Sequence, residues 1–142
     1  MQKKQSELNI ESVHRLGHVA IRVEDVNRAK SFYMTLGMKL IWDDTDWCYL
    51  EAGDSKDGLA LLGPSYKAAG PHFAFHFTNK QEVETIHRRL NDAGIQVGKT
   101  HNHRDGTSSF YLKDPEGNWL EMLYAPEGRI PSNQEGGGSL LA

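Results

Sequence analysis

The chain of 142 residues has a single cysteine, Cys48, so no disulfide bond can form within it. Cys48 lies in the strand-like stretch "DWCYL", where its thiol is most simply a small buried apolar group. Basic residues are not in excess either, because 16 Lys and Arg stand against 19 Asp and Glu, for a net charge of −3. A chain with this slight excess of acidic residues is not expected to present the basic surface that binds nucleic acid, so we expect no nucleic-acid partner.

Long apolar runs are also missing. No stretch approaches the roughly 20 apolar residues that a membrane-spanning helix needs, so we expect no membrane partner. The first residues, "MQKKQSELNIES", are polar and lack the apolar core of a signal peptide, so we expect a cytoplasmic location. We expect residues 1–15 to form a leader and the Gly-rich residues 127–142 to form a flexible tail.

The chain contains an internal repeat. "LGHVAIRV" (16–23) alternates as a β-strand does, and "EDVNRAKSFYMTLG" has the apolar spacing of a helix that stops at Gly37. Three short strand candidates follow, "MKLIWDD", "DWCYLEA" and "DGLALLG". This order of elements, one strand, one helix and three strands, is the first copy of the repeat.

The second copy has the same order of elements. "PHFAFHFT" predicts a strand, and "NKQEVETIHRRLNDAG" predicts a helix with Asn79 as its N-cap and Gly94 as its stop. "IQVGK", "SSFYLKD" and "NWLEMLY" predict three more strands, and Asp-Pro-Glu-Gly forms the turn between the last two. The copies lie about 55 residues apart. We expect one domain over 16–126, built from modules at about 16–63 and 71–126.

Three polar side chains interrupt these strands. His18 and His72 open the first strands of the two copies, and Glu121 lies in the last strand between two apolar residues. Taken singly, an inward histidine is often a hydrogen-bonded core residue, and a strand glutamate can reach solvent. A buried carboxylate is nevertheless costly unless something pairs with it. Two imidazoles and one carboxylate form the ligand set of a non-haem divalent-metal site with open positions, so we predict these three residues as metal ligands.

The repeat, together with "GHVAIRVEDVNRAKSFYMTLGM" and "FYLKDPEGNWLEM", resembles the vicinal oxygen chelate superfamily. That group includes glyoxalase I, extradiol dioxygenases, fosfomycin-resistance enzymes and bleomycin-binding proteins. The resemblance covers 16–126 and implies an α+β fold in which two βαβββ modules form a curved, barrel-like mixed sheet. It also implies metal ligands on the first strand of each module and on the last strand of the second. Those are the positions of His18, His72 and Glu121.

The motifs discriminate among the members only in part. Glyoxalase I carries a fourth ligand on the last strand of the first module, but residues 59–62 include no Glu, Gln or His. Arg22 matches a glutathione-contacting arginine of glyoxalases, and it equally suits an anion-binding or salt-bridged residue. Fosfomycin enzymes usually have Thr two residues after the first ligand histidine, where this chain has Ala20.

The extradiol pattern has a histidine, a short loop, an apolar residue and Tyr, a tight turn and then Glu. The chain offers His103, Tyr111 and Glu121 at these positions, although His101 stands where a small or aliphatic residue is usual. Fosfomycin enzymes share the turn and the tyrosine, and familiar two-domain dioxygenases are longer. The resemblance therefore implies a metal-dependent, extradiol-dioxygenase-like enzyme. The alternatives are a fosfomycin-type transferase or hydrolase, a glyoxalase-like isomerase and a bleomycin-type binding protein without metal.

The resemblance also assigns the cofactor and the catalytic residues. It favours Fe(II), with Mn(II), Ni(II) or Zn(II) as alternatives, on a small substrate chelated through adjacent oxygens. It makes His103 the general base, with His101 as the alternative, and it makes Tyr111 a hydrogen-bond donor to a bound oxygen. His76, four residues after His72, faces the same side of its strand, and its role is open.

The remaining predictions concern the surroundings of the site. The aromatic residues expected either to line a substrate cavity or to pack in the core are Trp42, Trp47, Tyr49 and Phe75. His14 and His87 are expected on the surface. By resemblance to small members of the superfamily, we expect a homodimer in which His18 comes from one subunit and His72 and Glu121 come from the other.

Overall fold

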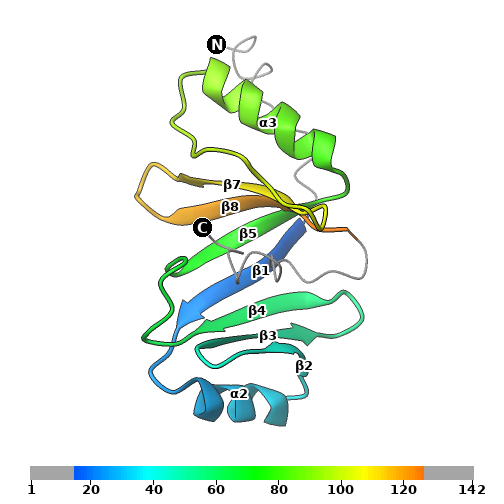
Figure 1. Cartoon of the computed structure of the whole chain (residues 1–142), viewed down its shortest axis with the longest axis vertical. Coiled ribbons are helices and arrows are strands. Elements are labelled where there is room, and N and C mark those ends of the chain that lie inside the picture. Colours follow the sequence, from blue (N-terminus) through cyan, green and yellow to red (C-terminus); the bar gives the residue numbers. More distant parts are fainter. Residues whose placement is uncertain (1–14, 127–142) are drawn as a thin grey trace.

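Figure 1 shows the computed structural model of the chain, in which the structure describes residues 15–126. The expected tail at 127–142 and most of the expected leader at 1–15 lie outside the described residues. Arg15 is described, and it is already part of the first strand.

The elements follow the repeated order of the two modules. The first module consists of β1 (Arg15–Arg22), α2 (Val26–Thr35), β2 (Lys39–Asp43), β3 (Trp47–Ala52) and β4 (Asp57–Leu62). The second module consists of β5 (His72–Phe77), α3 (Lys80–Asp92), β6 (His101–Asn102), β7 (Ser108–Lys113) and β8 (Trp119–Tyr124). The prediction of an α+β chain with two βαβββ modules is confirmed.

The prediction of a strand at 95–99 was wrong. In this segment only Val97 pairs, through an isolated bridge to Leu112, and the short strand β6 begins later. The backbone N–H of Gly98 donates to the carbonyl oxygen of Tyr111 at 2.7 Å, and a Cβ at Gly98 would lie 2.9 Å from that oxygen. The segment therefore contacts β7 at one point and does not continue along it.

The strands form one open mixed sheet in the order β2-β3-β4-β1-β5-β8-β7-β6 (Figure 1). β1 runs parallel to β4 and β5 runs parallel to β8, while the modules join where β1 and β5 pair antiparallel. β2 and β6 are the two edges, so the sheet does not close on itself. The first strand of each module consequently lies at the centre of the sheet.

The sheet has two different faces. On the face that we call the helix face, α2 packs on apolar residues of β3 and β4, and α3 packs on apolar residues of β5, β7 and β8. The opposite face, which we call the site face, presents the alternate residues of the same strands. Its first-module half holds a separate apolar cluster: Ala20, Trp47, Tyr49, Ala60, Leu62 and Tyr66. Figure 1 shows the two helices at opposite ends of the molecule.

Local sequence signals set the ends of both helices. The side chain of Asp25 accepts the backbone N–H of Arg28 at the start of α2, and Asn79 caps α3 as predicted. Gly37 and Gly94 follow the two helices with φ of 102° and 85°, a left-handed conformation that favours glycine. Both predicted stops are confirmed.

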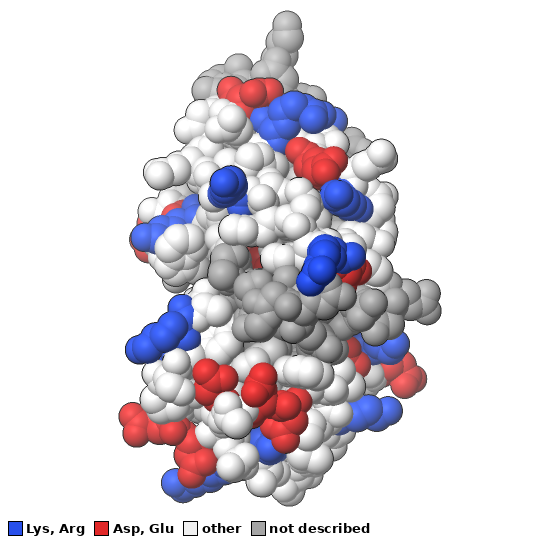
Figure 2. Space-filling view, in the orientation of Figure 1, with Lys and Arg blue, Asp and Glu red and all other residues white. Residues whose placement is uncertain are grey.

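No helix among residues 15–126 is long and apolar enough to cross a membrane. On the face shown in Figure 2, basic and acidic side chains are interspersed, without a broad patch of one sign.

Candidate metal centre

The strand register brings the three predicted ligands together. β1 and β5 pair Ala20 with His72 and His18 with Ala74, and β5 and β8 pair Ala74 with Glu121. All three ligands point to the site face at the centre of the sheet. Each is buried, with exposed fractions of 1% for His18, 6% for His72 and 0% for Glu121.

The ligand atoms form a nearly equilateral triangle. The Nε2 atoms of His18 and His72 lie 3.4 Å apart, and each lies 3.5 Å from Oε1 of Glu121. Donor atoms bound at about 2.1 Å to one cation are separated by roughly 3.0–3.5 Å, depending on the coordination geometry. The spacing and the mixed nitrogen and oxygen donors therefore fit one divalent cation.

The hydrogen bonds behind the triangle bear on which ring nitrogens carry protons. Nδ1 of His72 lies 2.9 Å from the carbonyl oxygen of Gly70, which can only accept, so Nδ1 donates and Nε2 of the neutral ring is a bare acceptor. Nδ1 of His18 lies 2.8 Å from Nε2 of His76, and a proton held on Nδ1 of His18 and donated to His76 would leave Nε2 of His18 bare as well. Two lone pairs and a carboxylate oxygen then face one another, an arrangement that a cation stabilises.

His76 is a part of the site whose role the sequence left open. Burial lowers the pKa of His76 to about 4, with a smaller contribution from Arg15, so the ring is neutral and its Nε2 can accept a proton from Nδ1 of His18. A Cβ at Gly17 would lie 2.0 Å from the His76 ring, so only glycine leaves room for this ring beside β1. Burial, reinforced by His76 and His72, also lowers the pKa of His18 well below its usual value.

Glu121 contributes the buried carboxylate of the group. Within the described residues neither of its buried carboxylate oxygens has a hydrogen bond of good geometry. Burial raises the pKa of Glu121, and nearby His72, Ser109 and Tyr111 offset this only partly. An ionised carboxylate in this position lacks a counter-charge, which a bound cation would supply.

One side of the triangle faces the first module. In the register of the second module Glu121 pairs with Tyr111, and in the first module the corresponding pair is Ala60 and Tyr49. Ala60 thus occupies, in β4, the place that Glu121 occupies in β8. Its methyl group offers no ligand, which agrees with the absence of a fourth protein ligand at 59–62.

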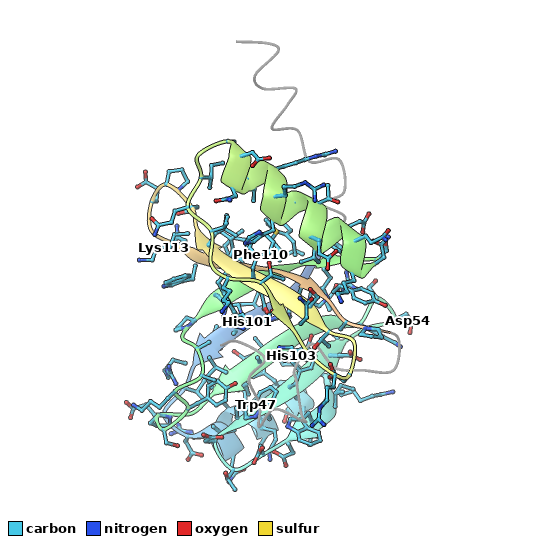
Figure 3. The ribbon with its side chains drawn as sticks, turned by 45° about the horizontal axis from the view of Figure 1, so that its top comes forward. Trp47, Asp54, His101, His103, Phe110 and Lys113 are labelled. Carbon is cyan, nitrogen blue, oxygen red and sulfur yellow. The ribbon has the colours of Figure 1, made fainter. Side chains whose placement is uncertain are left out.

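The two predicted catalytic residues have different environments. The ring of Tyr111 meets that of His72 edge to face at 5.4 Å, and burial together with Glu121 raises the pKa of Tyr111 far above its usual value, so its hydroxyl stays protonated. His103 is half-buried in the turn before β7, and its ring stacks on His101 at 6.4 Å (Figure 3). Burial lowers the pKa of His103, with Asp105 opposing, and its role as a base stays a prediction.

The aromatic residues lie on both faces of the sheet. Trp47 and Tyr49 belong to the apolar cluster of the site face, and Trp42 packs against it. The sequence reading missed Tyr66, which joins this cluster from the loop after β4. Phe75 packs in the α3 core on the helix face, so its alternative assignment to a substrate wall was wrong.

Arg22 has a structural role in this chain. Its guanidinium donates to the carbonyl oxygens of Gly63, Tyr66 and Ala69 at 2.6, 2.8 and 3.3 Å. These bonds hold the loop between the modules, which also supplies the carbonyl of Gly70 to His72. The glutathione-contacting alternative for Arg22 therefore has no support in the described contacts.

Two further sequence predictions concern residues away from the site. Cys48 is fully buried, as expected, and burial raises the pKa of its thiol to about 11. His87 is half-buried: it hydrogen-bonds the carbonyl of Gly98 at 2.8 Å and packs on Phe110, which corrects its assignment as an ordinary surface residue. His14 lies outside the described residues.

All three candidate ligands come from one chain. β1 pairs with β5 of the same chain, so His18 reaches His72 and Glu121 without a second subunit. This corrects the prediction that two subunits share each site. The homodimer itself stays a prediction.

The fold and the site together define a two-module α+β protein with a candidate metal centre on the open face of its sheet. The chain belongs to the Glyoxalase/Bleomycin resistance protein/Dioxygenase superfamily, whose family description matches residues 15–122.

Individual relatives support this membership. The chain is 30% identical over 113 residues to Glutathione transferase FosA of Serratia marcescens, covering 75% of this chain and 78% of that protein. It is 25% identical to 2,2',3-trihydroxybiphenyl 1,2-dioxygenase from Sphingomonas wittichii strain RW1, with a TM-score of 0.59, covering 78% of this chain and 42% of that one. Streptomyces coelicolor methylmalonyl-CoA epimerase shares the fold, at 21% identity and a TM-score of 0.64, over 84% of this chain and 100% of that one.

Proposed function

We propose that the chain is a divalent-metal-dependent enzyme that binds a small substrate through two adjacent oxygens and, with Fe(II), cleaves a catechol ring beside its hydroxyls with dioxygen. The observation that carries this proposal is the buried triangle of two imidazole nitrogens and a carboxylate oxygen at the centre of the site face. A set of two histidines and one carboxylate with open positions is typical of non-haem Fe(II) oxygenases. The likeness to the trihydroxybiphenyl dioxygenase supports the same class.

The proposed chemistry divides the work between the metal and the chain. Fe(II) would polarise the two chelated oxygens and supply electron density to dioxygen. His18, His72 and Glu121 would hold the ion. Tyr111, which stays protonated beside Glu121, would donate a hydrogen bond to a bound oxygen. His103, a neutral imidazole at pH 7, would accept a phenolic proton.

The test uses untagged protein purified without oxygen and reconstituted separately with Fe(II), Mn(II), Ni(II) or Zn(II). We expect dioxygen uptake with 3,4-dihydroxyphenylacetate in the Fe(II) form, and a visible absorption band from the ring-cleaved product. The His103→Gln variant should bind the same amount of iron and turn over at least tenfold more slowly. Reconstituted iron protein that consumes no dioxygen with any catechol would remove the dioxygenase proposal.

A transferase of the fosfomycin type is the second candidate. Its support is the 30% identity to FosA, which covers most of that protein, and a tyrosine ten residues before the glutamate. The discriminating assay follows the loss of free thiol when the Mn(II) form is mixed with glutathione and fosfomycin. Thiol consumption without dioxygen uptake would move the assignment to the transferase.

Further predictions follow from the resemblance. A bleomycin-type binding protein would bind ligand without metal, so metal-independent ligand binding in the absence of any turnover would favour that class. We also propose that the chain is a cytoplasmic homodimer. Sedimentation analysis of the purified protein tests the oligomeric state.

A further inference from the structure

A cavity of about 480 Å³ lies between segment 95–101 and the hairpin of β7 and β8. Its basic lining residues are Lys99, His101 and Lys113, and its lining includes no Asp or Glu. The rest of the wall includes Ile95 and Trp119, two large apolar side chains that are exposed by 37% and 47%. The cavity thus combines positive charge with exposed apolar surface, in a chain whose net charge is −3.

The two lysines of the cavity have no acidic partner among the described residues. Elsewhere in the described part of the chain, Lys30 pairs with Asp43 at 2.9 Å and Arg15 pairs with Asp57 at 3.1 Å. The ammonium group of Lys113 instead lies over the ring of Trp119, 4.9 Å from its centroid. Such a stack orients a cation beside an aromatic face and leaves the cation available to an anionic ligand.

The cavity adjoins the metal centre. Tyr111 lines the cavity and also contacts His72, so this tyrosine is a shared wall. Trp119 and Glu121 are two residues apart on β8 and therefore point to the same face of the sheet. At the rise of a β-strand, their positions are separated by about 7 Å.

We propose that the substrate carries an anionic group, remote from its chelating oxygens, which binds Lys113 and Lys99 while its apolar part packs on Trp119. The inference deepens the proposed function and rests on it for the position of the chelating oxygens. Because Trp119 lies on the same face of β8 as Glu121 and two residues from it, the substrate class is a catechol that bears a side chain ending in a carboxylate.

The alternative occupant is a neutral apolar ligand held by Ile95 and Trp119 alone. Two observations favour the anion. The lining contains three potential cations and no carboxylate, and neither lysine forms an ion pair within residues 15–126. Charge-assisted hydrogen bonds from an ammonium to a carboxylate are stronger than neutral ones. A neutral ligand would leave this positive charge unmatched.

The test separates this cavity from the metal centre by using phenylacetate, which has the ring and the carboxylate but no vicinal hydroxyls. Benzyl alcohol is the neutral comparison. Binding to the full-length protein, with and without a chelator, is measured by titration while the indole N–H signal of Trp119 is followed by NMR. Trp119→Phe identifies that signal. The variants are Lys113→Met and Lys99→Met, with Lys39→Met on the opposite edge strand β2 as the matched control.

We expect phenylacetate to shift the Trp119 signal and to bind with or without the chelator. Lys113→Met should weaken its binding roughly tenfold, and Lys99→Met should weaken it to a smaller extent. Lys39→Met should match the wild type, and benzyl alcohol should bind all four proteins equally weakly. Phenylacetate that binds no better than benzyl alcohol, or that binds Lys113→Met and Lys39→Met alike, would overturn the inference even if metal binding and dioxygen uptake were established.

Discussion

Nδ1 of His18 lies 2.8 Å from Nε2 of His76, and this contact orients His18 towards His72 and Glu121. The pair connects the candidate metal centre to a residue that is not itself a ligand. Groups that hydrogen-bond a metal-binding histidine fix its orientation and its protonation. His76 is therefore a positioning residue, and its removal should be measurable as metal affinity.

His76→Ala should weaken metal binding by roughly 10–100-fold while the three ligands remain. His76→Gln, whose side-chain oxygen also accepts a hydrogen bond, should recover part of that loss. Competition with a coloured chelator measures the affinity. His87→Gln, which changes a histidine on α3 away from the site, is the control and should bind metal as the wild type does. Equal affinities for His76→Ala and the wild type would show that the contact with His18 has no positioning role.

Gly17→Ala should reproduce the effect of losing His76. The added Cβ would lie 2.0 Å from the His76 ring, so the ring must move away from His18 or the strand must distort. Overpacking of this kind costs about 1–3 kcal/mol in the free energy of unfolding. Gly70→Ala is the matched control, since a Cβ there meets nothing within 4 Å. Chemical denaturation and metal titration of both variants check the prediction, which fails if the two behave alike.

Glu121→Gln should stabilise the metal-free protein while it abolishes metal binding. The amide keeps the shape of the side chain without a buried charge, so we expect a gain of roughly 1–3 kcal/mol in the free energy of unfolding near neutral pH. Addition of the metal should raise the melting temperature of the wild type only. A variant that is less stable than the metal-free wild type would argue against an uncompensated carboxylate.

The pH dependence of that difference has a defined sign. Burial raises the pKa of Glu121 above 4.5, so between its unfolded and folded pKa values the folded state holds a proton that the unfolded state has lost. The free energy of unfolding of the metal-free wild type therefore falls as the pH rises through this window. Glu121→Gln lacks this contribution, and its advantage should grow from pH 4.5 upward. Denaturation curves at several pH values, recorded with a chelator present, measure the difference.

Tyr111→Phe should leave metal binding nearly unchanged and slow turnover by roughly 10–100-fold, because the lost hydroxyl is a donor for a bound oxygen. Tyr33→Phe, in α2 on the helix face of the sheet, is the matched control and should retain full activity. Steady-state rates in the Fe(II) form separate the two variants. An unchanged rate for Tyr111→Phe would show that this hydroxyl does not act on substrate.

Much of the fold was predictable because its signals are local. Strand alternation, the glycine stops of both helices, the Asn79 cap and the repeat of elements lie within short windows of sequence, and they predicted both modules. The prediction of a strand at 95–99 was wrong. This segment pairs with β7 only around Val97 and Gly98, and no local sequence pattern encodes where that pairing stops.

The clustering of His18, His72 and Glu121 was predictable from the equivalent places of the two histidines in the repeat and from the cost of burying Glu121. The contact that orients His18 was not predictable from the sequence. The His76 ring reaches His18 beside Gly17 only because β1 pairs with β5. Phe75 was assigned to a wall as an alternative because an aromatic residue in a strand fits either face until the register is known. Whether His18 meets His72 and Glu121 within one chain likewise depends on which strands pair.

The most direct test of the account is the metal content of untagged protein purified without oxygen, beside His72→Ala. We predict about one equivalent of divalent metal per chain in the wild type, and its loss in a variant that keeps the far-ultraviolet circular dichroism of the wild type. Wild-type protein that stays free of metal even after reconstitution, or a His72→Ala variant that retains the full equivalent, would contradict the claim that His18, His72 and Glu121 form a metal centre.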